Sequence, residues 1–274
     1  MKPSAFDYIR ADSAEETVAL LAQHGEEAKI LAGGQSLMAM LNFRLAQPAM
    51  LIDISRCRDL DYVRIDKGHL VVGAAATQAS VEHRASLASD VPLLDLVFPW
   101  ISHVQIRNRG TVCGSVAHAD PSAELPLCLA ALEGEVVLRS KAGRRVLKAD
   151  AFFQGMLMTA VKPGEIVEEV RYPLRRPEAR YAFEEVAMRH GDYAIVAVAA
   201  VVTTDTIALT VGGVADRPQR ASWPRLGGAE LEGAINDFAW ELDARDDAHA
   251  SAAYRRHLVR QLGIKLIRQA HETL

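Results

Sequence analysis

Two glycine-containing stretches decide how this chain folds: AGGQSL at residues 32–37 and QIRNRGTVCGSVAHADPSAELP at residues 105–126. The first stretch follows a short apolar run at residues 29–31 and precedes a helical pattern at 37–45, after which a second apolar run covers 50–54. This order predicts a strand, a glycine turn, a helix and a second strand. A turn of that kind leaves backbone N–H groups free to face an anion.

Taken alone, the first stretch has two interpretations. Gly33 and Gly34 fit either a tight turn that needs positive φ or a close backbone approach to a phosphate, with Gln35 and Ser36 adding side-chain donors. The stretch is not a P-loop, because no Gly-Lys-Ser/Thr follows, and it does not match G-x-G-x-x-G. ATP chemistry therefore loses its main support.

The second stretch offers a matching set of groups. Gly110 and Gly114, with the hydroxyls of Thr111 and Ser115, suit a second face of the same diphosphate. Farther along, Asp120 and Glu124 suit acceptors for ribityl, ribose or ring N–H groups, although Asp-Pro-Ser is also an ordinary start of a helix. His118 has no second His or Cys at ligand spacing, so it is expected to contact the cofactor or the backbone and not a metal.

Patterns elsewhere predict a mixed α and β chain. Ser13 and Glu16 form a capping box ahead of a helix that ends at Gly25. Hairpins are expected at the turns 66–68 and 141–143. The other expected elements are helices at about 92–104, 120–132 and 252–271, and strands at 166–170, 181–186, 195–202 and 206–211.

Composition and charge exclude several classes of protein. The 274 residues carry a net charge of −4 and no long basic stripe, so nucleic acid is not the expected ligand. No apolar run approaches the roughly 20 residues of a transmembrane helix, and the first ten residues lack a secretory signal, which makes the cytoplasm the expected location. Cys57, Cys113 and Cys128 form no CxxC pair, so we expect no iron–sulfur cluster, zinc site or disulfide framework within this chain.

Together the two stretches resemble the medium FAD-binding subunit of the molybdenum hydroxylases. This family includes the carbon monoxide dehydrogenase medium subunit and the flavin domain of xanthine dehydrogenase. The resemblance continues in order through PGEIV at 163–167, FEEVA at 183–187, RHGDYA at 189–194 and YRRHL at 254–258, and so covers essentially the whole chain.

The resemblance implies an α+β fold in two domains. A two-part FAD-binding domain would cover residues 1–175, with a small β-α-β subdomain at about 1–57 and a larger mixed α/β subdomain at 58–175, of the vanillyl-alcohol-oxidase (PCMH) type. A small α+β domain of the CO dehydrogenase flavoprotein type would follow at 176–274. Pro173 and Pro177, with arginines between them, mark the expected boundary.

The resemblance also assigns an FAD site, in which residues 32–36 and 110–115 hold the diphosphate from two sides. Tyr193 would lie beside the isoalloxazine ring and regulate access to it; a core tyrosine at the start of an apolar strand is the plainer alternative. The residues expected to contact FAD are Lys29, Ile30, Leu31, Ala32, Gly33, Gly34, Gln35, Ser36, Leu37, Thr77, Ile101, Gly110, Thr111, Cys113, Gly114, Ser115, His118, Asp120, Glu124, Ile166 and Tyr193.

This sequence departs from its relatives at one point of the second stretch. Relatives commonly have Gly-Gly where this chain has Cys113-Gly114. A cysteine takes positive φ less easily than glycine, so the loop is expected to differ slightly in shape. Backbone N–H groups would still bind a phosphate if residue 113 has an ordinary φ.

The function that the resemblance implies is electron transfer. A large subunit with a molybdopterin cofactor would hydroxylate a small substrate, and a small subunit with two [2Fe-2S] clusters would pass the electrons to FAD in this chain. FAD would then reduce NAD, a quinone, a cytochrome or dioxygen, and a dimer of such heterotrimers is expected. No residue is assigned as a general acid or base, and none as a metal ligand.

Two other functions stay open on the sequence alone. A self-contained FAD oxidoreductase would use the same type of fold, but its substrate domain is usually larger than the roughly 100 residues that end this chain. A non-catalytic scaffold that has lost its flavin has Cys113 as its only support in the sequence.

Overall fold

The N-terminal part of the chain is a small parallel sheet with helices beside it. The computed structural model describes residues 1–272. Strands β1 (Asp7–Arg10), β3 (Met50–Asp53) and β2 (Ala28–Leu31) pair in that order, all parallel. Helix α1 (Ala14–His24) precedes a 3-10 turn (Gly25–Glu27), and α2 (Leu37–Asn42) joins β2 to β3. The predicted β-α-β unit is confirmed, although its helix ends at Asn42 and β1 was not predicted.

Local capping explains where α1 begins. The Ser13 hydroxyl accepts a hydrogen bond from the Glu16 N–H at 3.1 Å, as the capping box predicts. The Glu16 carboxylate accepts a hydrogen bond from the Asp12 N–H at 2.7 Å, whereas in a regular capping box it would accept one from the N–H of Ser13. Gly25 ends the helix with a φ of 56°, a value that glycine adopts without steric cost.

The middle part is built on a five-stranded antiparallel sheet in the order β4-β5-β10-β6-β7. Both predicted hairpins are present, and in the first one Lys67 and Gly68 have φ values of 46° and 78°, which suit the right-handed twist of the strands. The strands are β4 (Val63–Asp66), β5 (His69–Gly73), β6 (Glu135–Ser140), β7 (Gly143–Lys148) and β10 (Ile166–Pro173), beside a small pair, β8 (Phe153–Gly155) and β9 (Met158–Thr159). The helices are α3 (Gln78–Glu82), α4 (Leu87–Asp90), α5 (Pro92–Val97), α6 (Val104–Arg107), α7 (Val112–His118), α8 (Glu124–Ala131) and α9 (Ala149–Phe152), and 3-10 turns cover Arg58–Leu60 and Phe98–Trp100.

Three predictions for this part were wrong in detail. The helix expected at 92–104 breaks into α5, the turn Phe98–Trp100 and α6, because Pro99 lacks an N–H and Ser102 takes a φ of 42°. The glycine-rich loop expected over residues 109–115 is shorter than that, because helix α7 begins at Val112. The helix expected from Asp120 begins at Glu124, because Asp120 accepts the N–H of Ser122 at 2.9 Å in a turn of its own.

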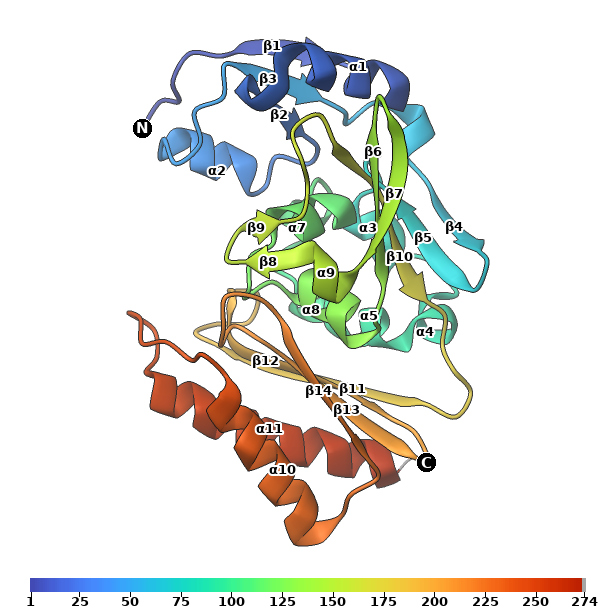
Figure 1. Ribbon diagram of the computed structural model, residues 1–274, viewed down its shortest axis with the longest axis vertical. Coiled ribbons are helices and arrows are strands. Elements are labelled where there is room, and N and C mark those ends of the chain that lie inside the picture. The colour runs from blue at the N-terminus through green and yellow to red at the C-terminus, as the bar shows by residue number, and fades with distance from the viewer. Residues whose placement is uncertain (273–274) are drawn as a thin grey trace.

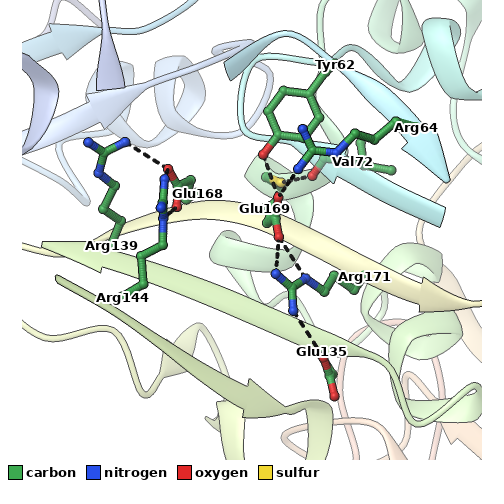
Figure 2. Close-up of polar contacts among 10 residues, drawn as sticks. Tyr62, Arg64, Val72, Glu135, Arg139, Arg144, Glu168, Glu169 and Arg171 are labelled. Carbon is green, nitrogen blue, oxygen red and sulfur yellow. Dashed lines mark hydrogen bonds and ion pairs between the residues drawn. The ribbon is translucent and has the colours of Figure 1, made fainter. Parts of the chain in front are cut away.

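Two buried carboxylates on β10 hold the middle sheet together. Glu168 and Glu169 are each 5% exposed. Arg139 and Arg144 both donate to Glu168, while Arg171 and the Tyr62 hydroxyl donate to Glu169 at 2.7 and 2.6 Å (Figure 2). The register of β10 against β6 shifts between Val167 and Glu169, so the ion pairs stabilise the sheet where its ladder is irregular.

The C-terminal part is a four-stranded antiparallel sheet with two helices. Its strands are β11 (Arg180–Ala187), β12 (Ala194–Val202), β13 (Thr206–Gly212) and β14 (Gln219–Pro224), paired in that order, and its helices are α10 (Gly228–Glu241) and α11 (Ala252–Glu272). Figure 1 shows both helices on the outer face of the sheet, with the middle part of the chain on the opposite face. Strand β14 and helix α10 were not predicted.

Candidate functional site

The two glycine stretches touch through their backbones. A Cβ atom placed on Gly33 would lie 2.1 Å from the carbonyl oxygen of Arg109 and 2.6 Å from the Cα of Gly110. Real Cβ atoms essentially never approach within 3.0 Å, so only glycine fits at residue 33. The absence of a side chain is therefore what lets the turn after β2 lie against the loop before α7.

Backbone N–H groups of the first turn are unpaired. Within residues 1–272, no acceptor takes the N–H of Gly34, Gln35 or Ser36, and Gly34 has the φ of 74° that redirects the chain there. The side-chain amide of Gln35 donates to the Gly33 carbonyl oxygen at 2.9 Å, so it braces the turn and is not a free donor. Successive unpaired N–H groups of this kind form an anion-binding concavity.

The second loop contributes fewer free hydrogen-bond donors than the sequence suggested. The Thr111 hydroxyl caps α7 by accepting the Gly114 N–H at 2.9 Å, which removes the Gly114 N–H from the set. Thr111 forms an isolated antiparallel bridge with Thr77, and neither Val112 nor Cys113, which are 0% and 2% exposed, lines the cleft described below. Residue 113 has an ordinary helical φ, so the cysteine does not distort the loop.

A cleft of about 530 Å³ opens where the two stretches meet. Residues from the first turn, from α7 and α8, and from the turn between β11 and β12 line it, so it lies between parts of the chain that are far apart in sequence. Of the residues predicted to contact FAD, it is lined by Lys29, Ile30, Ala32, Gly33, Gly34, Gln35, Ser36, Leu37, Ile101, Gly110, Thr111, Gly114, Ser115, His118, Glu124 and Tyr193.

The other predicted residues lie outside this cleft. Thr77 caps α3 by accepting the N–H of Ser80 at 3.1 Å, and Asp120 is occupied by its own turn. Leu31 lies in β2, and Cys113 is 2% exposed with its thiol directed at the Val72 carbonyl oxygen, 3.3 Å away. Burial raises the pKa of the Cys113 thiol, which argues against a redox role for it.

A second cavity of about 560 Å³ adjoins the first. Lys29, Ile30, Ala32, Gly114, Ala117 and Leu157 line both. Cys113 and Ile166 line the second cavity, beside the loop Pro163-Gly164-Glu165. Arg145 holds this loop through two hydrogen bonds of 2.7 Å to the Glu165 carboxylate.

Gln78 is a site residue that the sequence did not reveal. It is 6% exposed, it lines the cleft, and its side-chain oxygen Oε1 has no partner among the described residues. Its own N–H donates to the Gly110 carbonyl oxygen at 2.8 Å, which fixes α3 against the second loop. An isolated glutamine carries no recognisable signal in a sequence, and an orphaned buried oxygen in a cleft indicates a missing donor.

Burial sets the charge state of the groups in the cleft. It raises the pKa of Glu124 to about 7, with Asp120 adding to the rise, so this carboxyl is partly protonated at neutral pH. Burial lowers the pKa of His118 and favours its neutral form. Loss of water around the Tyr193 hydroxyl raises its pKa, with the charge of Asp120 adding and the Ser36 hydroxyl acting in the opposite direction.

Tyr193 reaches the cleft from the C-terminal part. Its side chain is 58% exposed and lies in the turn between β11 and β12, where Gly191 packs on the Ser102 carbonyl oxygen. The buried Arg255 donates to the carbonyl oxygens of Ile195 and Gly213, which tie α11 to the β12 and β13 ends near this turn. The site is therefore assembled from both halves of the chain.

Comparison with known proteins identifies the family of this chain. The model for the FAD binding domain in molybdopterin dehydrogenase matches residues 4–175, and the model for the CO dehydrogenase flavoprotein C-terminal domain matches residues 181–270. The chain is a medium, FAD-binding subunit of the molybdenum hydroxylase family. The predicted family, α+β fold and FAD cofactor are thereby confirmed.

Several relatives resemble the whole chain. The chain is 38% identical to the 6-hydroxypseudooxynicotine dehydrogenase complex subunit alpha of Paenarthrobacter nicotinovorans, covering 96% of this chain and 93% of the relative. The structure of carbon monoxide dehydrogenase from Hydrogenophaga pseudoflava matches with a TM-score of 0.93 at 31% identity, over 99% of both chains. Quinoline 2-oxidoreductase from Pseudomonas putida 86 also matches with a TM-score of 0.93 at 32% identity, over 100% of this chain and 99% of the matched chain. All three are oxidoreductases or their subunits.

The described residues offer neither a membrane-spanning helix nor a cluster of metal-ligating side chains. Within residues 1–272, no helix combines the length and apolar character needed to cross a bilayer. Over the same residues, no group of three or more His, Cys, Asp or Glu side chains is placed to hold a metal ion.

Proposed function

We propose that this chain is the electron-transfer subunit of a molybdenum hydroxylase and binds FAD between its two glycine stretches. The observation that carries the proposal is the contact of Gly33 with the Arg109–Gly110 backbone, which forms a cleft edged by unpaired N–H groups in a chain of this family. The N–H groups of residues 34–36 would bind the diphosphate, and Gly110, Thr111, Gly114 and Ser115 of the second stretch would lie on its other side.

The two adjoining cavities suit an extended dinucleotide. Because they share six lining residues, one ligand can extend through both, with the diphosphate at the shared boundary near Ala32 and Gly114. We place the isoalloxazine half in the cleft beside Tyr193 and Glu124, and the adenosine half in the second cavity beside Ile166. The orphaned Oε1 of Gln78 would accept a hydrogen bond from the ligand.

FAD supplies the redox chemistry, since it exchanges electrons singly with iron–sulfur clusters and in pairs with an external acceptor. The residues of this chain bind and orient it and set the local charge. Tyr193 lines the cleft from the C-terminal part and would lie beside the isoalloxazine ring, where it would regulate access to the ring. Glu124, partly protonated at neutral pH, can both donate and accept a hydrogen bond at the cleft wall.

The relatives are named as subunits of larger complexes, as medium chains or as alpha and beta subunits. We propose that the partners here are a large molybdopterin subunit and a small subunit with two [2Fe-2S] clusters, arranged as a dimer of heterotrimers. Exposed apolar side chains flank the residues that line the cleft and suit a docked protein: Met38, Phe43, Leu45, Met156, Met158 and Met188. The three free, buried cysteines suit a reducing compartment, and we place the complex in the cytoplasm.

Reconstitution tests the proposal. The purified chain, incubated with FAD and desalted, should keep stoichiometric flavin absorbance, and a reduced [2Fe-2S] subunit from the same complex should bleach it. A colourless chain that refuses FAD would support the scaffold alternative. Oxidation of an organic substrate by the flavin-loaded chain alone would support a self-contained oxidoreductase and contradict the partner requirement.

A further inference from the structure

One segment of the cleft wall has a backbone conformation that its own residues do not favour. Ile101 and Ser102 both line the cleft, and they lie between the turn Phe98–Trp100 and helix α6. Ser102 has a φ of 42°, in the left-handed region that residues other than glycine seldom adopt. Such a conformation persists only where contacts from neighbouring segments hold it.

The guanidinium group of Arg107 makes contacts of this kind. Its Nη1 donates hydrogen bonds to the carbonyl oxygens of Ile101 and Ser102, at 2.7 and 3.2 Å. Its Nε and Nη2 donate to the two carboxylate oxygens of Glu82, at 2.7 and 2.9 Å. The two side chains are only 13% and 20% exposed, so water competes little for these bonds. One guanidinium thus serves four acceptors, which the compact ammonium group of a lysine cannot reproduce.

Glu82 is a firm anchor because helix α3 is itself fixed at its other end. Glu82 is the last residue of α3, and Gln78 is the first. The Gln78 N–H donates to the carbonyl oxygen of Gly110, at 2.8 Å, and Val81 is buried in the core of the middle part. Helix α3 therefore joins the second glycine stretch to Arg107, and through Arg107 to the wall of the cleft.

The carbonyl group of Ser102 also contacts the turn that carries Tyr193. A Cβ atom placed on Gly191 would lie 3.0 Å from the Ser102 oxygen, and Gly191 has a φ of 86°. A second contact joins the same two segments, since the rings of Trp100 and His190 lie 5.3 Å apart. Gly191 and Tyr193 line the cleft together with Ser102. The guanidinium and the turn therefore meet at one carbonyl oxygen.

We propose that Arg107 is a positioning residue for the flavin end of the cleft. It holds the Ser102 carbonyl group in place and, through this group, the turn that carries Tyr193. Without the four hydrogen bonds of Arg107, Ser102 can leave the left-handed region, and the turn loses the oxygen on which Gly191 packs. The wall beside the flavin ring then opens to solvent. The inference rests on the proposed function, because it concerns FAD bound in this cleft.

The first test uses the FAD-free chain and measures hydrogen exchange of the amides in residues 101–108. Arg107→Lys should accelerate this exchange roughly tenfold or more, because hydrogen bonds from a charged donor are lost. The matched control is Arg84→Lys, which alters an ion pair with Asp90 outside the cleft. The control should exchange as the wild type does. Exchange in Arg107→Lys equal to that of the wild type would overturn the proposal.

Exchange in helix α10, which is remote from the cleft lining, separates a local effect from a global one. It should be the same in all variants. An equal acceleration in α10 would mean that Arg107 stabilises the whole chain and not this segment, and would also overturn the proposal. If Arg107→Lys does not fold, Glu82→Gln repeats the test with a milder change, because it keeps the guanidinium and weakens only its anchor. It should accelerate exchange in residues 101–108 in the same direction.

The second test uses the FAD-loaded chain and measures the quenching of flavin fluorescence by iodide. Arg107→Lys and Gly191→Ala should each increase the quenching constant, because each disturbs the same contact at Ser102. The double variant should then show no more than the larger single effect. Additive effects, or unchanged quenching in Arg107→Lys, would overturn the proposal.

Binding of FAD by the wild type separates this proposal from the proposed function. A wild-type chain that refuses FAD contradicts the proposed function, and the role of Arg107 toward the flavin falls with it. A wild-type chain that binds FAD, with exchange and quenching unaltered in Arg107→Lys, contradicts only the role of Arg107.

Discussion

The substitution Gly33→Ala perturbs the contact on which the FAD site depends. The added methyl group would lie 2.1 Å from the Arg109 carbonyl oxygen and 2.6 Å from the Gly110 Cα, and both neighbours are backbone atoms that cannot rotate away. To reach 3.0 Å, the two loops must separate by roughly 0.9 Å. Gly33 has no positive φ, so the contact alone produces the effect.

The size of the effect follows from that displacement. Overpacking of a close contact costs about 1–3 kcal/mol of folding free energy. Because the displaced loops carry the N–H groups that would bind the diphosphate, we expect the dissociation constant for FAD to rise roughly 10- to 100-fold, which corresponds to about 1.4–2.8 kcal/mol.

Isothermal titration of the FAD-free chain with FAD, together with urea unfolding, measures both quantities. The matched control is Gly233→Ala, in the interior of α10, where an added Cβ meets nothing within 4 Å. It should leave FAD binding unchanged and stabilise the chain by up to about 1 kcal/mol. If Gly33→Ala bound FAD as tightly as the wild type, with unaltered stability, the assignment of these loops to the diphosphate would be refuted.

Three further predictions follow from buried groups. The pKa of Glu185 is about 8 in the folded chain against 4.5 for an ordinary glutamate, so its contribution to the free energy of unfolding is complete below pH 4.5 and is lost as the pH rises through 8. In urea unfolding of the FAD-free chain, Glu185→Gln should remove roughly 4–5 kcal/mol of this pH-dependent loss of stability. Arg255→Ala leaves two carbonyl oxygens without their donor and should cost about 2–5 kcal/mol, whereas Arg268→Ala, which breaks an exposed pair with Glu232, should cost under about 1 kcal/mol; similar losses would argue against the role of Arg255. All three cysteines are buried, so Ellman's reagent should find no rapidly reacting thiol until the chain is unfolded.

Local signals in the sequence were read correctly where a single residue type is required. The capping serine of α1, the glycine that ends it and the two hairpin turns all lie where they were predicted. Each depends on atoms within a few residues of one another, so composition and order are enough. The missed elements depend on distant partners instead. In Asp7–Arg10 only Tyr8 and Ile9 are apolar or partly apolar, so the segment has no clear strand pattern, and it becomes strand β1 because it pairs with β3.

The candidate site shows the same limit. Most of the residues that resemblance assigned to FAD line one cleft, yet Thr77 and Asp120 are used for local capping and turn formation. Gln78, next to Thr77, lines the cleft in its place, because the helix that Thr77 caps directs the following side chain inward. Such a difference of one residue depends on backbone direction, which a sequence pattern does not specify.

By itself, the sequence determined the two hairpin turns, the cap of α1, most strands and the family to which the chain belongs, because these depend on short motifs and on the order in which they occur. Only the tertiary structure decided that Gly33 lies against the backbone of Gly110, that Gln78 lines the cleft with an unpaired Oε1, and that Glu185 is buried without a hydrogen-bond partner among the described residues. These are contacts between segments far apart in the chain, and their energies arise from packing and burial, which exist only once the chain has folded.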